Sequence, residues 1–530
     1  MTNCEVCKNP ANQKCAGCHN VFYCNKEHQK EHWKDHKKQC RPFEMQNDEQ
    51  IGRHFVATKD IAEGDIIFQE KPLVVGPLQL TLPTCMGCGN YINVKSVTSC
   101  SKCGWPMCCK DCENDPSHAP ECYYTVKRGQ KVSITNFEVH HPIYRCVTVL
   151  RCLYQKQFAP DVWKKIVKLE SHCKTRENTE GYEQDRIYVA DFILNFFKVD
   201  GLFSKEEILK VCGVIMVNCH EIPLSTPSQN GLFNMTSIFE HSCHHNTYKT
   251  FSPNGAVKLV AGIPIKKGEN VSICYTEPLQ TTLYRQKHLN ESKFFSCLCK
   301  RCRDVTEFGT NLTALRCQKG KCKGIVLPKS FQNNCTHWFC RKCGNKVTTE
   351  YAIDVTKRVS NDLVVIDKNS VDDCKKFINY YDNILSPNHA YMIDIKLVLA
   401  QLIGDGSHSL QSLSESDLLY KQQLCEELMH VIQTVVPAEK RVIGILLIEI
   451  YAAKTELQRR KPTNGGKYKK SENPFDTLME CMTILRKAIA CLQHEPNLLF
   501  EGKLCQQARN DLKKLEICSK TILQDPANFT

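Results

Sequence analysis

Cysteine pairs at short, regular spacing constrain the fold of this chain more than any other feature. The 530 residues contain 35 cysteines and 19 histidines. In a short secreted protein such a count would indicate disulfide bonds, but this chain is long and its first residues lack the basic and apolar segments of a secretion signal. Clustered thiols that stay reduced bind metal, so the pairs are predicted to hold zinc in a soluble, intracellular protein.

The composition excludes other classes of protein. Apolar residues make up 42% and charged residues 24% of the chain, which is ordinary for a globular protein and excludes wholesale disorder. At ~100–200 residues per domain, the chain should contain several compact units. The best apolar run, from Ile443 to Ile450, is interrupted by Glu449 and falls short of the ~18 residues that a membrane span needs. No membrane-spanning segment is therefore expected.

Zinc ligands occupy the start of the sequence. They form four pairs: Cys4 and Cys7, Cys15 and Cys18, Cys24 and His28, and His36 and Cys40. Because zinc takes four nitrogen or sulfur ligands in a tetrahedron, these pairs predict two ions. His36 and Cys40 lie in a stretch without glycine or proline, so both are expected on one face of a helix. His32 lies on the same stripe and is expected to be a surface residue.

The same order of ligands recurs later in the chain, which indicates an internal repeat. Its members are Cys85, Cys88, Cys100, Cys103, Cys108, Cys112, His118 and Cys122. Cys109 competes with Cys108 for one ligand position, and Cys108 preserves the spacing of the first copy. Residues 114–116 replace the basic helix of the first copy with Asn-Asp-Pro and predict a shorter last helix. Two further zinc ions are expected here.

Three separate segments carry residues that suit a catalytic site. The first is Gly52-Arg53-His54, between the two repeats, and the second is Glu240-His241-Ser242-Cys243. The third, residues 268–275, alternates Val271, Ile273 and Tyr275, which is typical of a half-buried strand. Soon afterwards come Cys297, Cys299 and Cys302.

Together these segments resemble the SET and MYND domain-containing (SMYD) family of protein-lysine methyltransferases, in particular its arthropod branch with an additional N-terminal MYND finger. The resemblance covers essentially the whole chain. It implies zinc sites formed by Cys4, Cys7, Cys24 and His28, by Cys15, Cys18, His36 and Cys40, and by Cys243, Cys297, Cys299 and Cys302. In that family a MYND finger interrupts the SET domain, as residues 85–122 do here.

The resemblance implies an α+β multidomain fold. The expected parts are a MYND finger (1–45), the start of a β-rich SET domain (46–84), a second MYND-like finger (85–122), a helical insertion (123–235), the SET catalytic core (236–293), a post-SET zinc motif (294–303), a zinc-ribbon-like segment (304–350) and an all-α, TPR-like domain (351–530).

The implied reaction transfers a methyl group from S-adenosyl-L-methionine to a lysine amine of a protein. Free lysine has a pKa of ~10.4, so a narrow apolar channel would favour the neutral amine that the reaction needs. Tyr275 matches the family tyrosine whose hydroxyl aligns amine and methyl group. The cofactor-binding positions carried over from the family are Gly52, Arg53, Glu170, His172, Asn218, Ser237, Glu240, His241 and Phe295.

Two departures from the family pattern favour weaker cofactor binding. His54 stands where the family has a glycine, and its ring would obstruct the close approach that glycine allows. Glu240 replaces an asparagine, and its carboxylate would repel the cofactor carboxylate and is costly to bury unpaired. An alternative function is therefore a SET scaffold with little catalysis that recruits peptide partners through its fingers.

The remaining chain predicts a third zinc region and a helical tail. Cys317, Cys322, Cys340 and Cys343 resemble a zinc ribbon, with Cys335 as a competing partner of Cys340. Apolar residues at helical spacing follow: Met392, Ile395, Leu399 and Leu402, then Leu424, Leu428, Val431 and Val435. Residues 443–453 are apolar all round and are expected to be deeply buried, and residues 461–474 are expected to form a polar loop.

Zinc binding changes what the charge implies about partners. About six ions would bring +12 and 21 thiolate ligands −21, which lowers the formal net charge from +13 to about +4. Sequence-specific DNA binding is not supported. The resemblance implies histone or non-histone lysines as substrates, proline-containing peptides of corepressors or deacetylases as finger ligands, a monomer, and both nuclear and cytoplasmic location.

Overall fold

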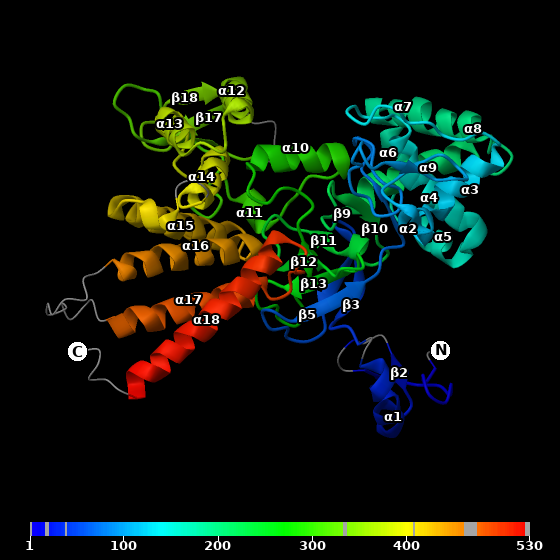
Figure 1. The fold of residues 1–530 in the computed structure, drawn as a ribbon, viewed down its shortest axis with the longest axis horizontal. Helices are drawn as coiled ribbons and strands as arrows, with labels where there is room; N and C mark the ends of the chain where they lie inside the picture. Colours follow the sequence, from blue (N-terminus) through cyan, green and yellow to red (C-terminus); the bar gives the residue numbers. More distant parts are fainter. Residues whose placement is uncertain are drawn as a thin grey trace.

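A β-rich centre lies between two helical regions. The computed structural model describes residues 3–15, 18, 21–37, 40–331, 336–405, 409–460 and 474–524. The helices of residues 119–218 lie on one side of the centre, those of residues 390–524 on the other, and the first finger projects from the centre near the N-terminus (Figure 1). The predicted mixture of helix and sheet is confirmed.

The first finger is a short hairpin followed by one helix. Its elements are β1 (Gln13–Lys14), β2 (Phe22–Tyr23) and α1 (Lys26–His36). The side chain of Asn25 caps α1 by accepting the N–H of His28. The prediction that His36 and Cys40 share a helix face is wrong, because α1 ends at His36 and Cys40 lies beyond it. Cys40 nevertheless lies with His36 in one set of four converging ligands.

Small sheets form the centre of the molecule. They comprise the hairpin β3 (Phe43–Asp48) with β4 (Gly52–Ala57); the sheet of β12 (Thr247–Phe251), β13 (Val257–Ala261) and β5 (Ile66–Glu70); the sheet of β6 (Val74–Pro77), β10 (Gln229–Leu232) and β9 (Cys219–Ile222); and the parallel pair β11 (Glu240–His241) and β14 (Ser272–Ile273). The rings of Phe43, Phe55 and Phe239 fill their core in tilted and edge-to-face contacts, with centroids 4.6–5.2 Å apart. The expected strand around Tyr275 is short, and Tyr275 follows its end.

The second finger leads directly into the helical insertion. The elements are β7 (Thr98–Ser99), β8 (Pro106–Met107), α2 (Lys110–Glu113), a 3-10 turn (Pro116–His118), α3 (Ala119–Lys127), α4 (Tyr144–Phe158), α5 (Pro160–Ile166), α6 (Cys173–Arg176), α7 (Glu180–Asp185), a π-helical turn (Arg186–Asp191), α8 (Phe192–Phe197) and α9 (Lys205–Asn218). The last helix is shortened as predicted, but only slightly: α3, which carries Cys122, has nine residues where α1 has 11, and the four-residue α2 precedes it.

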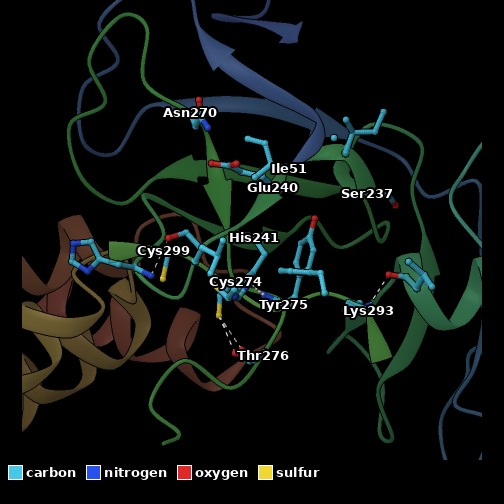
Figure 2. A pocket seen from close by; sticks show the side chains of 18 of the residues that line it. Ile51, Ser237, Glu240, His241, Asn270, Cys274, Tyr275, Thr276, Lys293 and Cys299 are labelled. Atoms are coloured by element: carbon cyan, nitrogen blue, oxygen red, sulfur yellow. Dashed lines mark hydrogen bonds between the residues drawn. The ribbon is translucent and has the colours of Figure 1, made fainter. Parts of the chain in front are cut away.

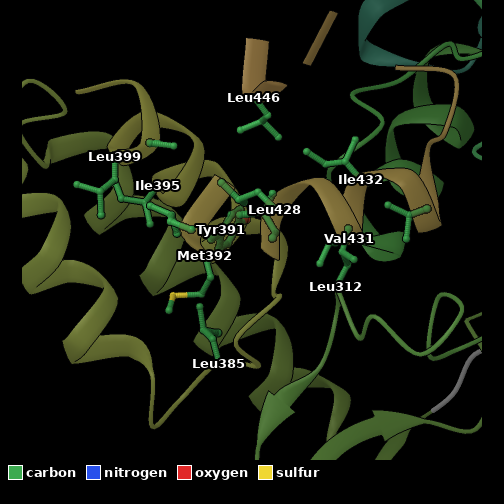
Figure 3. Packing of buried hydrophobic residues seen from close by; sticks show 14 of the residues in the cluster. Leu312, Leu385, Tyr391, Met392, Ile395, Leu399, Leu428, Val431, Ile432 and Leu446 are labelled. Atoms are coloured by element: carbon green, nitrogen blue, oxygen red, sulfur yellow. The ribbon is translucent and has the colours of Figure 1, made fainter. Parts of the chain in front are cut away.

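A ribbon and a stack of helices complete the chain. They comprise α10 (Thr282–Ser292), α11 (Lys300–Arg303), the four-stranded sheet β15 (Leu315–Arg316), β16 (Ile325–Pro328), β17 (His337–Cys340) and β18 (Lys346–Thr348), and the helices α12 (Thr349–Val365), α13 (Val371–Tyr381), α14 (Ala390–Leu402), α15 (Glu415–Val435), α16 (Lys440–Arg459), α17 (Pro474–Leu492) and α18 (Phe500–Gln524). Residues of α14 and α15 form one apolar core with Leu446 of α16 (Figure 3).

The sequence predicted this core well, with one exception. The apolar faces of α14 and α15 are buried as expected, apart from a half-buried Leu402. Residues 443–453 are not buried all round, because Ile445, Ile448 and Tyr451 are half-exposed on one side of α16.

Cys335 and residues 461–473 lie outside the described residues. Among the described helices, none is long and apolar enough to cross a membrane.

A buried ion-pair cluster joins α10, α11 and the segment before the ribbon. The Glu307 carboxylate accepts hydrogen bonds from Arg285 (Nη2 to Oε2, 3.0 Å) and Arg301 (Nε to Oε2, 2.8 Å). All three side chains are fully buried. Arg301 also donates to the carbonyl of Cys243 at 3.1 Å, and Thr313 donates to Glu307 at 2.8 Å. The cluster therefore ties a predicted zinc ligand to α10 and to the segment before the ribbon.

We expect Glu307→Gln to destabilise this region by about 3–5 kcal/mol, because it leaves two guanidinium groups buried without their counter-charge. Hydrogen exchange of zinc-replete protein measures the effect as increased opening of residues 282–315. The matched control is Glu291→Gln, which removes an exposed pair with Lys287 and should change stability by less than about 1 kcal/mol. Equal effects of the two variants would contradict the role of Glu307 as the buried counter-charge of Arg285 and Arg301.

Candidate active site and zinc centres

At least five sets of four cysteine or histidine ligands converge in the described part of the chain. In each set the ligand atoms lie within 4.8 Å of one another. The sets are Cys4, Cys7, Cys24 and His28; Cys15, Cys18, His36 and Cys40; Cys100, Cys103, His118 and Cys122; Cys243, Cys297, Cys299 and Cys302; and Cys317, Cys322, Cys340 and Cys343. The first two sets have the cross-braced arrangement that the resemblance implies.

The spacing of the sulfur atoms fits tetrahedral zinc. With Zn–S bonds of ~2.3 Å, two sulfurs of one tetrahedron lie about 3.8 Å apart. The Sγ atoms of Cys15 and Cys40 are 3.8 Å apart, and those of Cys317 and Cys343 are 3.7 Å apart. His32 takes no part in these sets, and its Nδ1 lies 3.0 Å from the hydroxyl of Tyr23. The residues present therefore fit structural zinc.

The second finger distinguishes its two neighbouring cysteines. The Sγ of Cys108 lies 3.7 Å from that of Cys88, and the N–H of Cys108 donates to Cys85 Sγ at 3.3 Å. Cys109 is exposed, and its Sγ lies 3.7 Å from Cys112. The geometry therefore favours Cys108 as the ligand that joins Cys85 and Cys88.

A residue missed by the sequence analysis orients the histidine ligand of this finger. His118 directs Nε2 toward Cys103 Sγ at 3.3 Å and Nδ1 toward Glu121 Oε1 at 2.9 Å. The carboxylate is fully buried and also accepts from Arg151 at 2.7 Å. Such a contact fixes the ring with its Nε2 lone pair free for metal. The available signal was a glutamate one helical turn after the histidine.

A single cavity of about 1610 Å³ brings together the predicted cofactor positions and the predicted catalytic tyrosine. Figure 2 shows Tyr275 with Ser237, Glu240 and His241 around it. The predicted positions in its lining are Gly52, Arg53, Glu170, His172, Asn218, Ser237, Glu240, His241, Phe295 and Tyr275. They come from segments as far apart in the chain as β4 and the loop after α10.

The glycine loop of the cavity is open, and His54 lies outside the lining. Gly52 has a φ of +71°, and no atom lies within 4 Å of the position that a Cβ would occupy. Successive side chains of a strand point to opposite faces. Arg53 therefore faces the cavity, while His54 is buried and places Nδ1 3.0 Å from the Gly52 carbonyl. The His54 side chain is therefore not part of the lining of the cavity.

Glu240 lies in the cavity wall, beside Ile51 and Asn270 in Figure 2. Burial raises the pKa of its carboxyl group, although a hydrogen bond with Asn270 and the nearby His54 and His241 act in the opposite direction. A half-buried carboxylate therefore faces the space in which the family asparagine is expected. Of the two departures, only this one changes the lining.

Tyr275 is tied to a zinc ligand through one histidine. Its backbone N–H donates to His241 Nδ1 at 2.9 Å, so the proton of a neutral ring lies on Nε2. His241 Nε2 lies 3.2 Å from Cys243 Sγ and can donate to that thiolate. The Tyr275 hydroxyl donates to the carbonyl of Phe239, and burial raises its pKa well above the usual value. The hydroxyl therefore remains protonated and oriented.

Hydrogen bonds connect the other predicted cofactor positions. Backbone N–H groups of His172 and Ser171 donate to Glu170 at 2.9 Å and hold the pKa of its carboxyl below the usual value. The Asn218 amide donates to the Glu170 carbonyl at 2.7 Å. Ser237 donates to the carbonyl of Phe233 at 2.7 Å. The Phe295 and His241 rings lie 6.0 Å apart.

Comparison with known proteins assigns these features to two domain types. Residues 4–40 match the MYND finger and residues 52–276 match the SET domain. Isoform A of the SET domain-containing protein SmydA-8 of Drosophila melanogaster is 29% identical over 362 residues, which cover 65% of this chain and 75% of that protein. The chain is a SET and MYND domain-containing protein.

Two other relatives of this SET and MYND protein carry enzyme names. Histone-lysine N-methyltransferase ASHR1 of Arabidopsis thaliana is 26% identical over 438 residues, which cover 77% of this chain and 85% of that protein. Histone-lysine N-methyltransferase SET5 of Candida albicans is 25% identical over 301 residues, which cover 48% and 62%. The SET domain and these relatives support membership of a lysine methyltransferase family.

The cavity of this SET and MYND protein also contains cationic residues that the sequence analysis missed. Lys249 and Lys293 line it, and Lys249 Nζ lies 3.2 Å from His220 Nδ1. No motif marks these residues. The available signals were indirect: Lys293 precedes Phe295 by two residues, and His220 follows Asn218 by two.

We expect native mass spectrometry to find six zinc ions, because the two fingers, the post-SET motif and the ribbon together offer six tetrahedral sets. Cys108→Ser should lose one ion, whereas the adjacent and exposed Cys109→Ser should keep all six. Retention of six ions by Cys108→Ser, or a count of four or fewer in the native protein, would contradict the ligand assignment.

Proposed function

We propose that this protein is an S-adenosyl-L-methionine-dependent protein-lysine N-methyltransferase. The observation that carries the proposal is the convergence of nine expected cofactor positions and Tyr275 on one cavity. The open space and positive φ at Gly52 supply the second support, because they suit close approach of a ligand to the backbone. In the proposed reaction the cofactor supplies an electrophilic methyl group.

The residues of the chain would act mainly by binding and orientation. Gly52 and Arg53 would hold one end of the cofactor, and Asn218 and Glu240 would supply polar contacts to it. The protonated Tyr275 hydroxyl, fixed by the Phe239 carbonyl, would orient the acceptor amine through its dipole. Burial around Tyr275 would favour the neutral form of that amine, which carries the lone pair for attack.

A second candidate is a scaffold with little catalysis that recruits proline-containing peptides of corepressors. It is supported by the Glu240 carboxylate in the cavity wall and by Trp33, which is 44% exposed on the helix of the first finger. Either function would link the protein to transcriptional repression, with histone or non-histone lysines as substrates of the enzyme. We further propose a monomer that is present in both nucleus and cytoplasm.

Calorimetric titration with S-adenosyl-L-methionine separates the two candidates. We expect the zinc-replete protein to bind with a Kd on the order of micromolar, since the His54 side chain contacts the Gly52 carbonyl and does not line the cavity. Glu240→Asn should bind more tightly, because it removes a carboxylate that repels the cofactor carboxylate. Absence of binding by the native protein, with binding restored by Glu240→Asn, would instead support the scaffold.

We expect Tyr275→Phe to keep cofactor affinity within about twofold and to lose about 10²–10³-fold in methyl transfer to histone lysines, because one oriented dipole is removed. A radiolabelled methyl-transfer assay measures the rate, and calorimetry provides the control for binding. Unchanged transfer by Tyr275→Phe would remove Tyr275 from the proposed mechanism.

A further inference from the structure

A lysine of the chain itself lies in the cavity next to Tyr275. The Nζ atom of Lys293 is 5.7 Å from the centroid of the Tyr275 ring. Lys293 follows the last residue of α10, in the loop that continues to Phe295 and Cys297 (Figure 2). An amine thus already occupies the neighbourhood in which the proposed reaction needs one.

Backbone carbonyls hold this amine beside an expected cofactor position. Lys293 Nζ donates to the carbonyl of Val217 at 2.6 Å and lies 3.4 Å from that of Met216. Val217 directly precedes Asn218, which lines the cavity. The contacts restrict the amine to the space between the end of α9 and Tyr275, and they orient its N–H bonds.

The same contacts also cap a helix, since the two carbonyls belong to the last turn of α9. A cap accounts for the position of a cation at this helix end. Capping does not explain why this lysine lies in a cavity beside Tyr275, because lysines cap exposed helix ends as well. A cap alone also predicts no chemical change at Nζ.

The surroundings of Lys293 favour an uncharged amine. Desolvation is the main cause that lowers its pKa to about 8; the Cys219 thiol acts in the opposite direction, and the charge of Lys249 acts in the same direction as desolvation. Other titratable groups in the lining are His220, His241, His288, Tyr275, Glu221, Glu240 and Glu277. Near pH 8 Lys293 therefore has a far larger neutral fraction than a lysine in water with a pKa of ~10.4.

We propose that Lys293 is a methyl acceptor and that the protein methylates itself at this residue. The inference rests on the proposed methyltransferase function. The Lys293 amine forms an N–C bond to the methyl carbon of S-adenosyl-L-methionine, and the C–S bond breaks with its electron pair remaining on sulfur. The methylated ammonium then loses a proton to water. The products are N-methyl-lysine and S-adenosyl-L-homocysteine, so no oxidant or further reactant is needed.

The first test needs no cofactor turnover. Native protein is pulse-labelled with acetic anhydride between pH 6 and 10, and peptide mass spectrometry follows each lysine. We expect Lys293 to reach half of its maximal labelling near pH 8, about two pH units below exposed lysines, and to be protected by S-adenosyl-L-homocysteine. Labelling that follows the exposed lysines and is not protected would overturn the inference.

The second test locates the product. Zinc-replete protein is incubated with S-adenosyl-L-methionine that carries a deuterated methyl group, and the label is mapped by peptide mass spectrometry. We expect label on Lys293 at a rate that is independent of protein concentration, as transfer within one molecule requires. Lys293→Arg, which keeps the cation, should lose this label. The matched variant Lys287→Arg, at an exposed position of α10, should retain the label on Lys293.

The outcomes separate this inference from the proposed function. If the protein binds the cofactor and methylates added histones but leaves Lys293 unlabelled, self-methylation is wrong and the methyltransferase function stands. If calorimetry detects no cofactor binding, both are wrong. A label that persists in Lys293→Arg belongs to another lysine and overturns the assignment.

Discussion

The zinc set of Cys243, Cys297, Cys299 and Cys302 is the constraint on which the site depends. It joins the segment after β11 to the loop after α10, which are more than fifty residues apart in the sequence. Through His241, the same set reaches the backbone N–H of Tyr275. Since thiolate–zinc bonds fix positions more rigidly than apolar packing does, this metal centre holds one wall of the cavity in place.

The ion-pair cluster behind that metal centre extends the constraint to α10 and to the segment before the ribbon. Arg301 donates to the Cys243 carbonyl and to the Glu307 carboxylate, which in turn accepts from Thr313. Full burial makes each charge depend on its partners, because an unpaired guanidinium would be strongly penalised there. Metal ligands, cavity wall and helices are thus linked through side chains without exposure to water.

The sequence predicted what local spacing controls and missed what tertiary contact controls. The zinc sets of the fingers and the ribbon could be found because their ligands lie a few residues apart in each pair, whereas Cys243 was assigned through the family resemblance. The end of α1 and the half-exposed side of α16 could not be found, since local periodicity does not determine them. The direction of His54 depends on its place in β4, which the sequence alone did not show. Lys293 contacts residues far away in the chain, and no motif marks it. Glu121 lies one helical turn after His118, but its burial beside Arg151 could not be predicted.

Lys293 also indicates how the cavity treats any lysine amine that enters it. Desolvation is the largest influence on Lys293, and it lowers the pKa from 10.5 to about 8. A substrate lysine in the same surroundings would meet the same desolvation, and it would also meet the positive charges of Lys249 and Lys293. Both effects favour the neutral amine. Glu221, Glu240 and Glu277 in the lining oppose them, although burial raises the pKa of Glu240 and Glu277. Under the proposed function, walls that make the charged form unfavourable would supply the neutral amine without a dedicated base.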